Sequence, residues 1–406
     1  MSLISNLAAG LFDARSRRPQ TDAAKLQVAR DRKGLSNEDP GPQSVVHHGI
    51  AWLGRAQDLT ASGDGGVARH YSLLSGWGTS YPETTGYIVP TMLEYSRRYS
   101  DASARDRARR MLDWLVSIQL PGGGFQGGRI DSKPVVPVTF NTGQILLGLA
   151  AGTAEFGDVY RPATMAAAGW LSSSLDADGC WRRHPTPFAA PGEKAYETHV
   201  AWGLFEAERV APGYGFGTAG MKNITWALTK QRPNGWFADN CLSDPKRPLT
   251  HTIGYVLRGI VEAHRYDGRE ELLESALRTA NGLEGAIAVN GFLAGCLDDA
   301  WRTAAAFACL TGNAQIAYCL LYLYQVTGIA RHRDLALALN SYVRRTIDIT
   351  GTSDVRGAVK GSHPVDGDYG RYEYLNWAVK FVVDSNQLEL DVIAQDRSGR
   401  APTAVR

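Results

Sequence analysis

Four residues along this 406-residue chain combine acid–base chemistry with similar surroundings. Each stands close to the start of an apolar run, and the four are Glu83, Glu197, His251 and Glu373. Two carboxyl groups beside one glycosidic bond can hydrolyse it, one as acid and the other as base or nucleophile. A histidine can instead abstract a proton next to a carbonyl or carboxylate, which leads to elimination or epimerisation. The residue types favour hydrolysis slightly, because glutamates outnumber histidines, and they leave the other two reactions open.

Amide, carboxylate and aromatic side chains accompany these four residues. A sugar presents hydroxyl groups that hydrogen-bond to amides and carboxylates, and apolar C–H faces that stack on aromatic rings. Residues 361–372 form a long charged and aromatic segment, which we expect to be a substrate rim or a lid. We predict that a saccharide substrate is bound by Trp77, Tyr81, Asn141, His199, Trp202, Tyr255, Asp298, Asp299, Trp301, Asn313, Gln315, Tyr369, Tyr372 and Trp377.

Simpler explanations exist for several of these residues. Glu83 and Glu197 could be acids that interact favourably with the dipole of a helix N-terminus, an effect of ~0.3–1 kcal/mol. The adjacent Asp298 and Asp299 could cap a helix, and a single histidine such as His251 is often only structural. The similar placement of polar residues in several repeats favours the functional interpretation of the set.

An internal repeat underlies this placement. Four tryptophans are separated by 62, 56 and 56 residues, and steps of 57 and 59 residues then reach two more large apolar residues. In order, the six positions are Trp52, Trp114, Trp170, Trp226, Leu283 and Tyr342. A second series at a similar spacing consists of Thr85, Thr142, Thr198, Thr252 and Thr311. Two series with one period predict six repeats of two elements each.

Both elements of the repeat have the pattern of a helix. Within 106–120 the apolar residues recur at steps of three and four, whereas 145–150 is apolar on all sides, as in a buried helix. We therefore predict an all-α fold, a single (α/α)6 toroid over residues 43–392 with an outer and an inner ring of helices. Residues 1–42 are expected to be a flexible basic arm and residues 393–406 a C-terminal tail. In such a ring, polar residues at the starts of the inner helices converge on one central site.

The repeat resembles two groups of known proteins. The segments from Trp114 to Gln119 and from Trp226 to Gln231 are similar to the Gln-Trp repeat of terpenoid cyclases and protein prenyltransferases. The plan of six hairpins also resembles the six-hairpin glycosidases, the related polysaccharide lyases and the N-acylglucosamine 2-epimerase group. These families share a scaffold and not a reaction. The Asp-x-Asp-Asp acid motif expected for terpene cyclisation is missing, since the nearest string, at 176–179, is typical of a turn.

Some proteins with this scaffold carry zinc. Resemblance to prenyltransferase β-subunits implies a candidate zinc set of Asp239, Cys241 and His251, because a catalytic zinc needs three protein ligands. Resemblance to lanthipeptide cyclases fails at Leu310, which stands where their histidine would be. Our main prediction contains no metal and no cofactor, and the zinc set is kept as an alternative.

Composition restricts the partners and the location. A net charge of +2 gives no indication of a nucleic-acid partner, and no apolar run reaches the ~18 residues that a transmembrane helix needs. Residues 1–7 lack the positive region of a secretory signal. The five cysteines lie in or beside apolar segments, which suits reduced thiols. We expect a cytoplasmic protein, and the oligomeric state is left open.

Together these observations predict a carbohydrate-active enzyme that acts on an oligosaccharide or glycan intermediate by glycoside hydrolase-like acid/base catalysis. A lyase or a sugar epimerase is the nearest variant. Two alternatives belong to other classes, namely a terpenoid cyclase-like or prenyltransferase-like enzyme acting on an isoprenoid, and a non-catalytic toroid that binds a glycan or a peptide.

Overall fold

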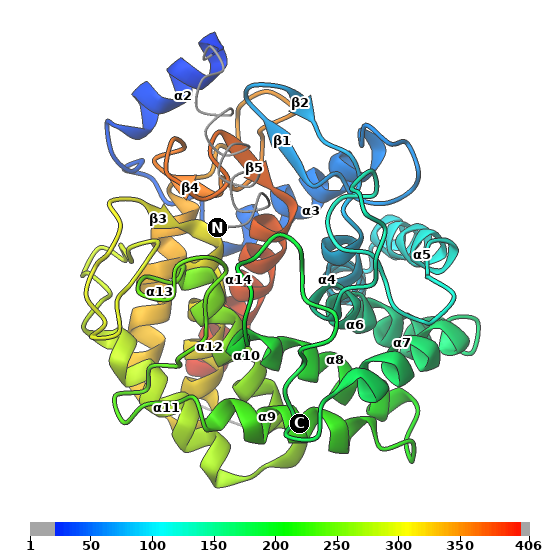
Figure 1. Cartoon of the computed structure of the whole chain (residues 1–406). Helices are drawn as coiled ribbons and strands as arrows, with labels where there is room; N and C mark the ends of the chain where they lie inside the picture. The colour runs from blue at the N-terminus through cyan, green and yellow to red at the C-terminus, as the bar shows by residue number, and fades with distance from the viewer. Residues whose placement is uncertain (1–20, 399–406) are drawn as a thin grey trace, which may run out of the picture.

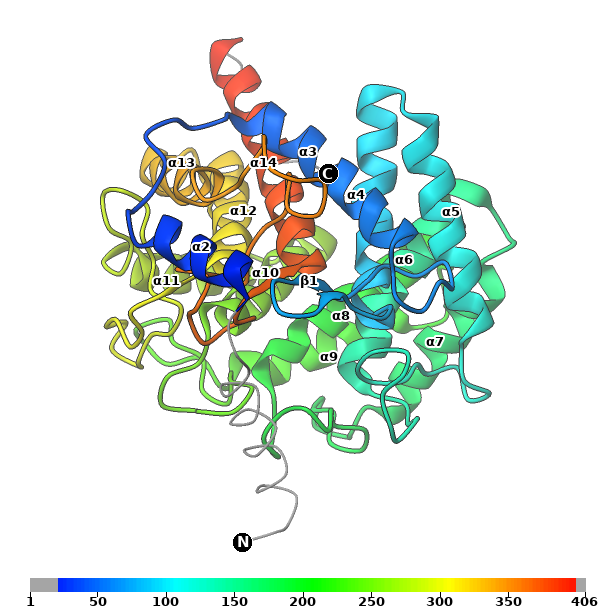
Figure 2. The same cartoon turned by 90° about the horizontal axis from the view of Figure 1, so that it is seen from above.

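Helical hairpins arranged in a closed ring make up most of the computed structural model, which describes residues 21–398 (Figures 1 and 2). The outer helices are α3 (Pro42–Asp58), α5 (Ala102–Ser117), α7 (Arg161–Ser174), α9 (Phe216–Leu228), α11 (Glu270–Glu284) and α13 (Ala330–Arg344). The inner helices are α4 (Pro82–Tyr99), α6 (Thr139–Phe156), α8 (Thr198–Val210), α10 (Thr250–Asp267), α12 (Leu310–Thr327) and α14 (Asn376–Arg397). Each inner helix contacts the next, and α14 contacts both α3 and α4, so the ring closes. The predicted (α/α)6 toroid is confirmed.

A glutamine that follows Trp52, Trp114 and Trp226 by five residues joins one outer helix to the next in three of the repeats. The Gln119 side-chain amide donates to the carbonyl oxygens of Gly123 at 2.9 Å and of Ala163, on α7, at 3.0 Å. Gly123 has a φ of +93°, and a Cβ there would lie 2.3 Å from the carbonyl oxygen of Ala166. Gly357, in the last repeat, makes the same kind of approach to His48 on α3, where a Cβ would lie 2.3 Å from the carbonyl oxygen. This contact connects the sixth repeat to the first.

The inner helices approach one another through glycines. A Cβ at Gly148 on α6 would lie 2.2 Å from the carbonyl oxygen of Gly86 on α4, and a Cβ at Gly203 on α8 would lie 2.6 Å from that of Gly143 on α6. Three of the threonines near the starts of the inner helices hydrogen-bond to the segments that precede their helices. For example, the Thr142 hydroxyl accepts a hydrogen bond from the Phe125 amide and thereby fixes the turn before α6.

Short strands, which the sequence did not predict, lie in the loops on one side of the ring (Figure 1). β1 (His70–Ser72) pairs antiparallel with both β2 (Gly76–Trp77) and β5 (Glu373–Leu375), and β3 (Ala308–Cys309) pairs antiparallel with β4 (Ser362–His363). The register places Ser72 opposite Glu373. The first and sixth repeats are therefore joined at this side, directly above the starts of α4 and α14.

The expected boundaries need correction at both ends of the chain. Residues 22–31 are a helix, α2 (Asp22–Asp31), whose Asp31 is buried and paired with Lys360, so this part of the predicted arm is folded and docked. Residues 1–20 lie outside the described part of the chain. At the other end α14 continues to Arg397, past the predicted boundary at 392, and residues 399–406 also lie outside the described range. Among the described helices, none is both long and apolar enough to cross a membrane.

Candidate active site

A buried carboxyl group lies where the inner helices begin. Glu83, in the first turn of α4, is 8% exposed, and its Oε2 accepts a hydrogen bond of 2.8 Å from the Asn141 side-chain amide on α6. Burial raises the pKa of Glu83 to about 7, although the hydrogen bond from Tyr81 and the charge of Arg69 act in the opposite direction. Near neutral pH this carboxyl group is therefore present in both protonation states, as a general acid or base requires.

Two histidines on neighbouring inner helices each lie against the side-chain amide of a glutamine. His199 Nδ1 lies 2.6 Å from Gln144 Oε1, and His251 Nδ1 lies 2.8 Å from Gln315 Oε1. Because an amide oxygen only accepts, Nδ1 carries the proton in both rings and Nε2 has a free lone pair. Burial lowers the pKa of His251 to about 4, and burial together with nearby positive charges lowers that of His199 well below its usual value. Both rings are neutral.

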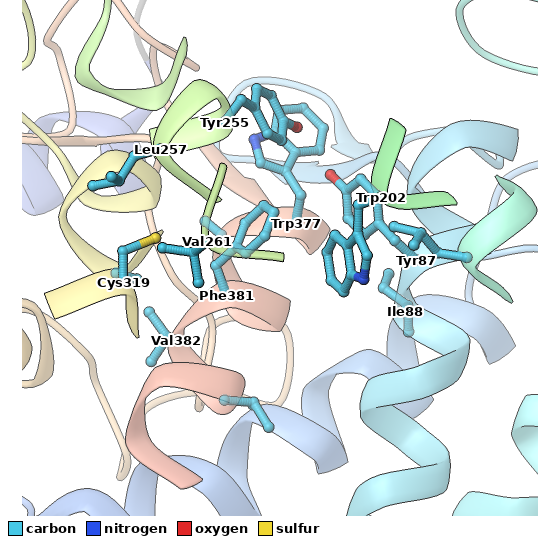
Figure 3. Close-up of a cluster of buried hydrophobic side chains, with 14 of the residues drawn as sticks. Tyr87, Ile88, Trp202, Tyr255, Leu257, Val261, Cys319, Trp377, Phe381 and Val382 are labelled. Carbon is cyan, nitrogen blue, oxygen red and sulfur yellow. The ribbon is translucent and has the colours of Figure 1, made fainter. Parts of the chain in front are cut away.

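Tyr255 on α10 lies between these histidines. Its ring centroid is 4.6 Å from that of His199 and 4.3 Å from that of His251. Aromatic residues from other inner helices converge on the same axis, including Tyr87, Trp202, Trp377 and Phe381 (Figure 3). The wall of the site is thus made of ring faces with polar groups between them.

Partly exposed and buried residues together form the outer edge of the site, on the strand side. Arg69 precedes β1, and its Nη1 donates to Glu373 Oε2 at 2.7 Å. The Arg69 guanidinium lies 5.1 Å from the ring centroid of Trp377, whose Nε1 donates to the Tyr369 hydroxyl at 2.8 Å. The Tyr81 ring is 6.0 Å from that of Trp377. This edge connects Glu83, through Tyr81, to Glu373.

Several buried polar atoms of the inner ring have no hydrogen-bond partner in the structure. They include Gln144 Nε2, His199 Nε2, Gln315 Nε2 and both side-chain polar atoms of Asn313. An unpaired buried polar group costs about 1–3 kcal/mol, so such groups rarely accumulate in a purely structural core. These four residues stand on α6, α8 and α12, near the helix starts, where hydroxyl groups of a ligand, or waters, could be bound.

Buried ion pairs fill the ring beyond the aromatic residues. Arg258 on α10 pairs with Glu262 at 2.7 Å, and its guanidinium lies 3.6 Å from the Tyr318 ring centroid. Lys380 on α14 pairs with Asp384 at 2.6 Å. The positive charges of Arg258 and Lys380 contribute to the lowered pKa of His199.

Comparison with known proteins identifies the fold. No protein-family model and no curated protein matches the chain. A heparin-specific unsaturated glucuronyl hydrolase is similar in structure, with a TM-score of 0.67 and 12% identity over 88% of this chain and 99% of that chain. The unsaturated glucuronyl hydrolase of Bacillus sp. GL1 gives a TM-score of 0.68 and 15% identity over 86% and 97%. The cellobiose 2-epimerase of Bacillus thermoamylovorans gives a TM-score of 0.68 and 9% identity over 89% and 98%. The fold is that of the six-hairpin glycosidases.

This six-hairpin ring brings together only some of the predicted site residues. Those that lie around the axis or at its strand-side edge are Glu83, Glu373, His251, Tyr81, Asn141, His199, Trp202, Tyr255, Asn313, Gln315, Tyr369 and Trp377. Glu197 makes no hydrogen bond with Glu83 and no ion pair with Arg69, and burial raises its pKa to about 8 against the opposing charge of Lys194. Its Oε2 is buried without a partner. We therefore do not pair Glu197 with Glu83.

Five predicted substrate contacts lie apart from this cluster, because their side chains face other elements. Trp77 lies against Trp52 of the outer helix α3, with ring centroids 5.3 Å apart. Trp301 lies against Trp236 at 5.1 Å, and Tyr372 belongs to a small cluster with Ala24 of α2. The other two are acids in surface ion pairs, Asp298 with Arg302 at 2.8 Å and Asp299 with Arg232 at 2.6 Å.

The candidate zinc ligands do not come together. His251 is held by Gln315 in the ring, whereas Asp239 pairs with Lys230 at 3.0 Å, where its side chain is 46% exposed. Within residues 21–398, no group of three His, Cys, Asp or Glu side chains is placed to hold a metal ion.

The sequence-based prediction also missed members of the site. Arg69 lies in a loop outside the repeat, and only the pairing of β1 with β5 brings it to Glu373. Gln144 and Tyr87 lie one turn deeper in their helices than the residues that were selected. Both residues could have been found by also considering the residue one helical turn after each selected position.

Proposed function

We propose that this protein is a carbohydrate-active enzyme that hydrolyses a glycosidic bond, with Glu83 as the general acid. The observation that carries the proposal is a buried carboxyl group with a pKa of about 7 beside unpaired polar atoms and aromatic ring faces. A protonated carboxyl group can donate to the leaving-group oxygen, and the unpaired amide and imidazole groups can bind sugar hydroxyls. The solved structures with this fold include glycoside hydrolases and a sugar epimerase, which supports a carbohydrate substrate.

Glu373 is the second carboxylate in this proposal. Arg69 holds it at 2.7 Å on the edge that Tyr81 connects to Glu83, and Trp377 offers a ring face beside it. Glu373 would activate a water molecule or stabilise the positive charge that develops on the sugar ring. Asn141, which donates to Glu83, keeps the acid in place.

The test is product analysis on a saccharide panel. Purified protein is incubated in H2¹⁸O with neutral β-linked oligosaccharides and with unsaturated glucuronyl oligosaccharides, and the products are weighed by mass spectrometry. Hydrolysis incorporates one ¹⁸O atom into the product. Glu83→Gln should abolish turnover, because an amide cannot donate a proton to the leaving group. Glu197→Gln is the matched control, a buried glutamate with a raised pKa outside the cluster. Full activity of Glu83→Gln would refute the assignment.

Epimerisation is the second candidate, and the two neutral histidines favour it. Both imidazole rings contact the Tyr255 ring, and two neutral bases this close together could remove and return a proton at a sugar carbon. The same panel in D2O distinguishes the reactions, because epimerisation places solvent deuterium on carbon and hydrolysis does not. In that case His199→Ala and His251→Ala would each stop the exchange.

The remaining alternatives have less support. An isoprenoid substrate would require an apolar cavity, whereas the inner wall here carries unpaired amide and imidazole groups. A binding protein without catalysis would not need the raised pKa of Glu83. We also propose that the protein is cytoplasmic, as its five cysteines are free thiols.

A further inference from the structure

Two loops next to Asn141 expose apolar side chains. Phe188, in the loop that leads from α7 to the 3-10 helix η1 (Ala195–Glu197), is 61% exposed. Val135 and Val136, in the loop before α6, are 42% and 38% exposed. A single exposed apolar residue is ordinary, but here an aromatic ring and two β-branched residues occur on adjoining loops.

Contacts between the loops hold these side chains near each other. The Phe188 ring lies over Gly128, where a Cβ would be 2.7 Å from two ring carbons. The Gly127 amide donates to the carbonyl oxygen of Val136 at 3.3 Å, and the Thr139 amide donates to that of His184 at 3.0 Å. The Phe188 ring and the backbone of Val136 therefore flank one glycine pair, Gly127 and Gly128.

Ion pairs fix the base of the Phe188 loop. Arg182, near its start, pairs with Asp178 at 2.6 Å and with Glu193 at 2.5 Å, and Glu193 also pairs with Lys230 at 2.6 Å. The loop is therefore anchored on both sides of Phe188.

The same loops adjoin the proposed acid. A Cβ at Gly127 would lie 3.7 Å from Oδ1 of Asn141, the residue that donates to Glu83. The Ile130 amide donates to the carbonyl oxygen of Ser80 at 2.9 Å, and the Thr79 hydroxyl donates to Asp131 at 2.9 Å. The exposed apolar group is thus continuous with the segment that carries Tyr81 and Glu83.

We propose that Phe188, Val135 and Val136 form a distal sugar platform, which stacks on the apolar face of a sugar residue beyond the one held at Glu83. The inference rests on the proposed function and narrows it, since the substrate would be an oligosaccharide or polymer and not a disaccharide. Flat C–H faces of pyranose rings match an exposed phenyl ring and two valines. Three side chains on rigid loops are too small an area for a stable protein interface, which buries ~800 Å² on each partner.

The test compares chain lengths in a Phe188→Ala variant. Kcat/KM is measured for a disaccharide and a hexasaccharide of each series in the panel described above. We expect the variant to lose roughly tenfold on the hexasaccharide through KM and to keep its activity on the disaccharide. Tyr214→Ala is the matched control, because Tyr214 is also 61% exposed but precedes α9 on the outer ring.

The outcomes separate this platform from the proposed function. If Phe188→Ala loses kcat/KM equally on the disaccharide and the hexasaccharide, or loses none on either, the platform is refuted and the proposed hydrolysis is unaffected. If the wild-type protein turns over no saccharide, the proposed function fails. Calorimetric titration of the hexasaccharide into the Glu83→Gln protein, with and without Phe188→Ala, then tests the platform directly. Weaker binding by the double variant than by Glu83→Gln alone supports the platform. Equal binding by the two proteins, or no binding by either, refutes it.

Discussion

Asp31 of α2 anchors the loop that supplies Tyr369 and Glu373 to the site. Its carboxylate accepts hydrogen bonds from Lys360 Nζ at 2.5 Å and from the Val365 amide at 2.8 Å, and the Lys360 and Asp31 side chains are only 2% and 3% exposed. Burial alone would raise the pKa of Asp31, but His363 and Lys360 outweigh it and hold the pKa at about 2. The carboxylate is therefore charged at all ordinary pH values.

We predict that Asp31→Asn destabilises the protein by about 3–5 kcal/mol, the usual cost of leaving one partner of a buried ion pair uncompensated. The asparagine has nearly the same size, so the loss reflects charge and not volume. The measurement is the free energy of unfolding from denaturant titration. Asp22→Asn, on the same helix, is the control, because Asp22 is fully exposed and pairs with the exposed Lys25. Its removal should change the stability by less than about 1 kcal/mol.

The pH dependence adds a second check. A carboxyl group whose folded pKa lies below its unfolded value of 3.8 contributes stability above pH 3.8 and loses it as the pH falls toward 2. The difference between the wild-type protein and Asp31→Asn should therefore be constant above about pH 5 and shrink below pH 3.8. A variant as stable as the wild type at pH 7 would refute the claim that α2 is an integral part of the fold.

Three further predictions follow from other features. Catalysis that needs protonated Glu83 and neutral His251 should fall above about pH 7 and below about pH 4. A kcat/KM profile that stays flat from about pH 3 to about pH 9 would contradict both roles. Glu197→Gln should stabilise the protein by up to about 5 kcal/mol at pH 9 and have little effect at pH 4. A folded pKa of about 8 means that ionisation of Glu197 lowers the stability of the wild-type protein as the pH rises. Denaturant titration at both pH values checks the sign. Gly123→Ala should destabilise the protein by several kcal/mol more than Gly34→Ala. Both glycines have φ near +95°, but only at Gly123 would the added Cβ lie 2.3 Å from a backbone oxygen. The thermal midpoints of the two variants give the difference.

The fold could be predicted from the sequence because its causes are local and repeated. A tryptophan on four of the six outer helices and a threonine near the start of five of the six inner helices recur in phase, and all of these residues except Trp170 are buried. Arg69 could not be predicted, since it acts on Glu373 only through a strand pairing between segments about 300 residues apart. Trp77 and Trp301 show the opposite error. They lie in the predicted rim loops, but their rings face the outer wall.

The arrangement of charges along the ring decides where a substrate can enter. Glycine contacts bring the inner helices close together, so inward-facing side chains fill the axis and leave few paths by which a substrate could reach the site. On one side of the aromatic residues the axis is occupied by the buried pairs Arg258–Glu262 and Lys380–Asp384, and moving these charges aside would expose unpaired ions at a cost of several kcal/mol. On the strand side the Arg69 side chain is 23% exposed. The strand side is therefore the route that we propose for a substrate, which would meet Arg69 first and the histidines last. Burial, together with the positive charges of Arg258 and Lys380, keeps His199 neutral at the far end of this route.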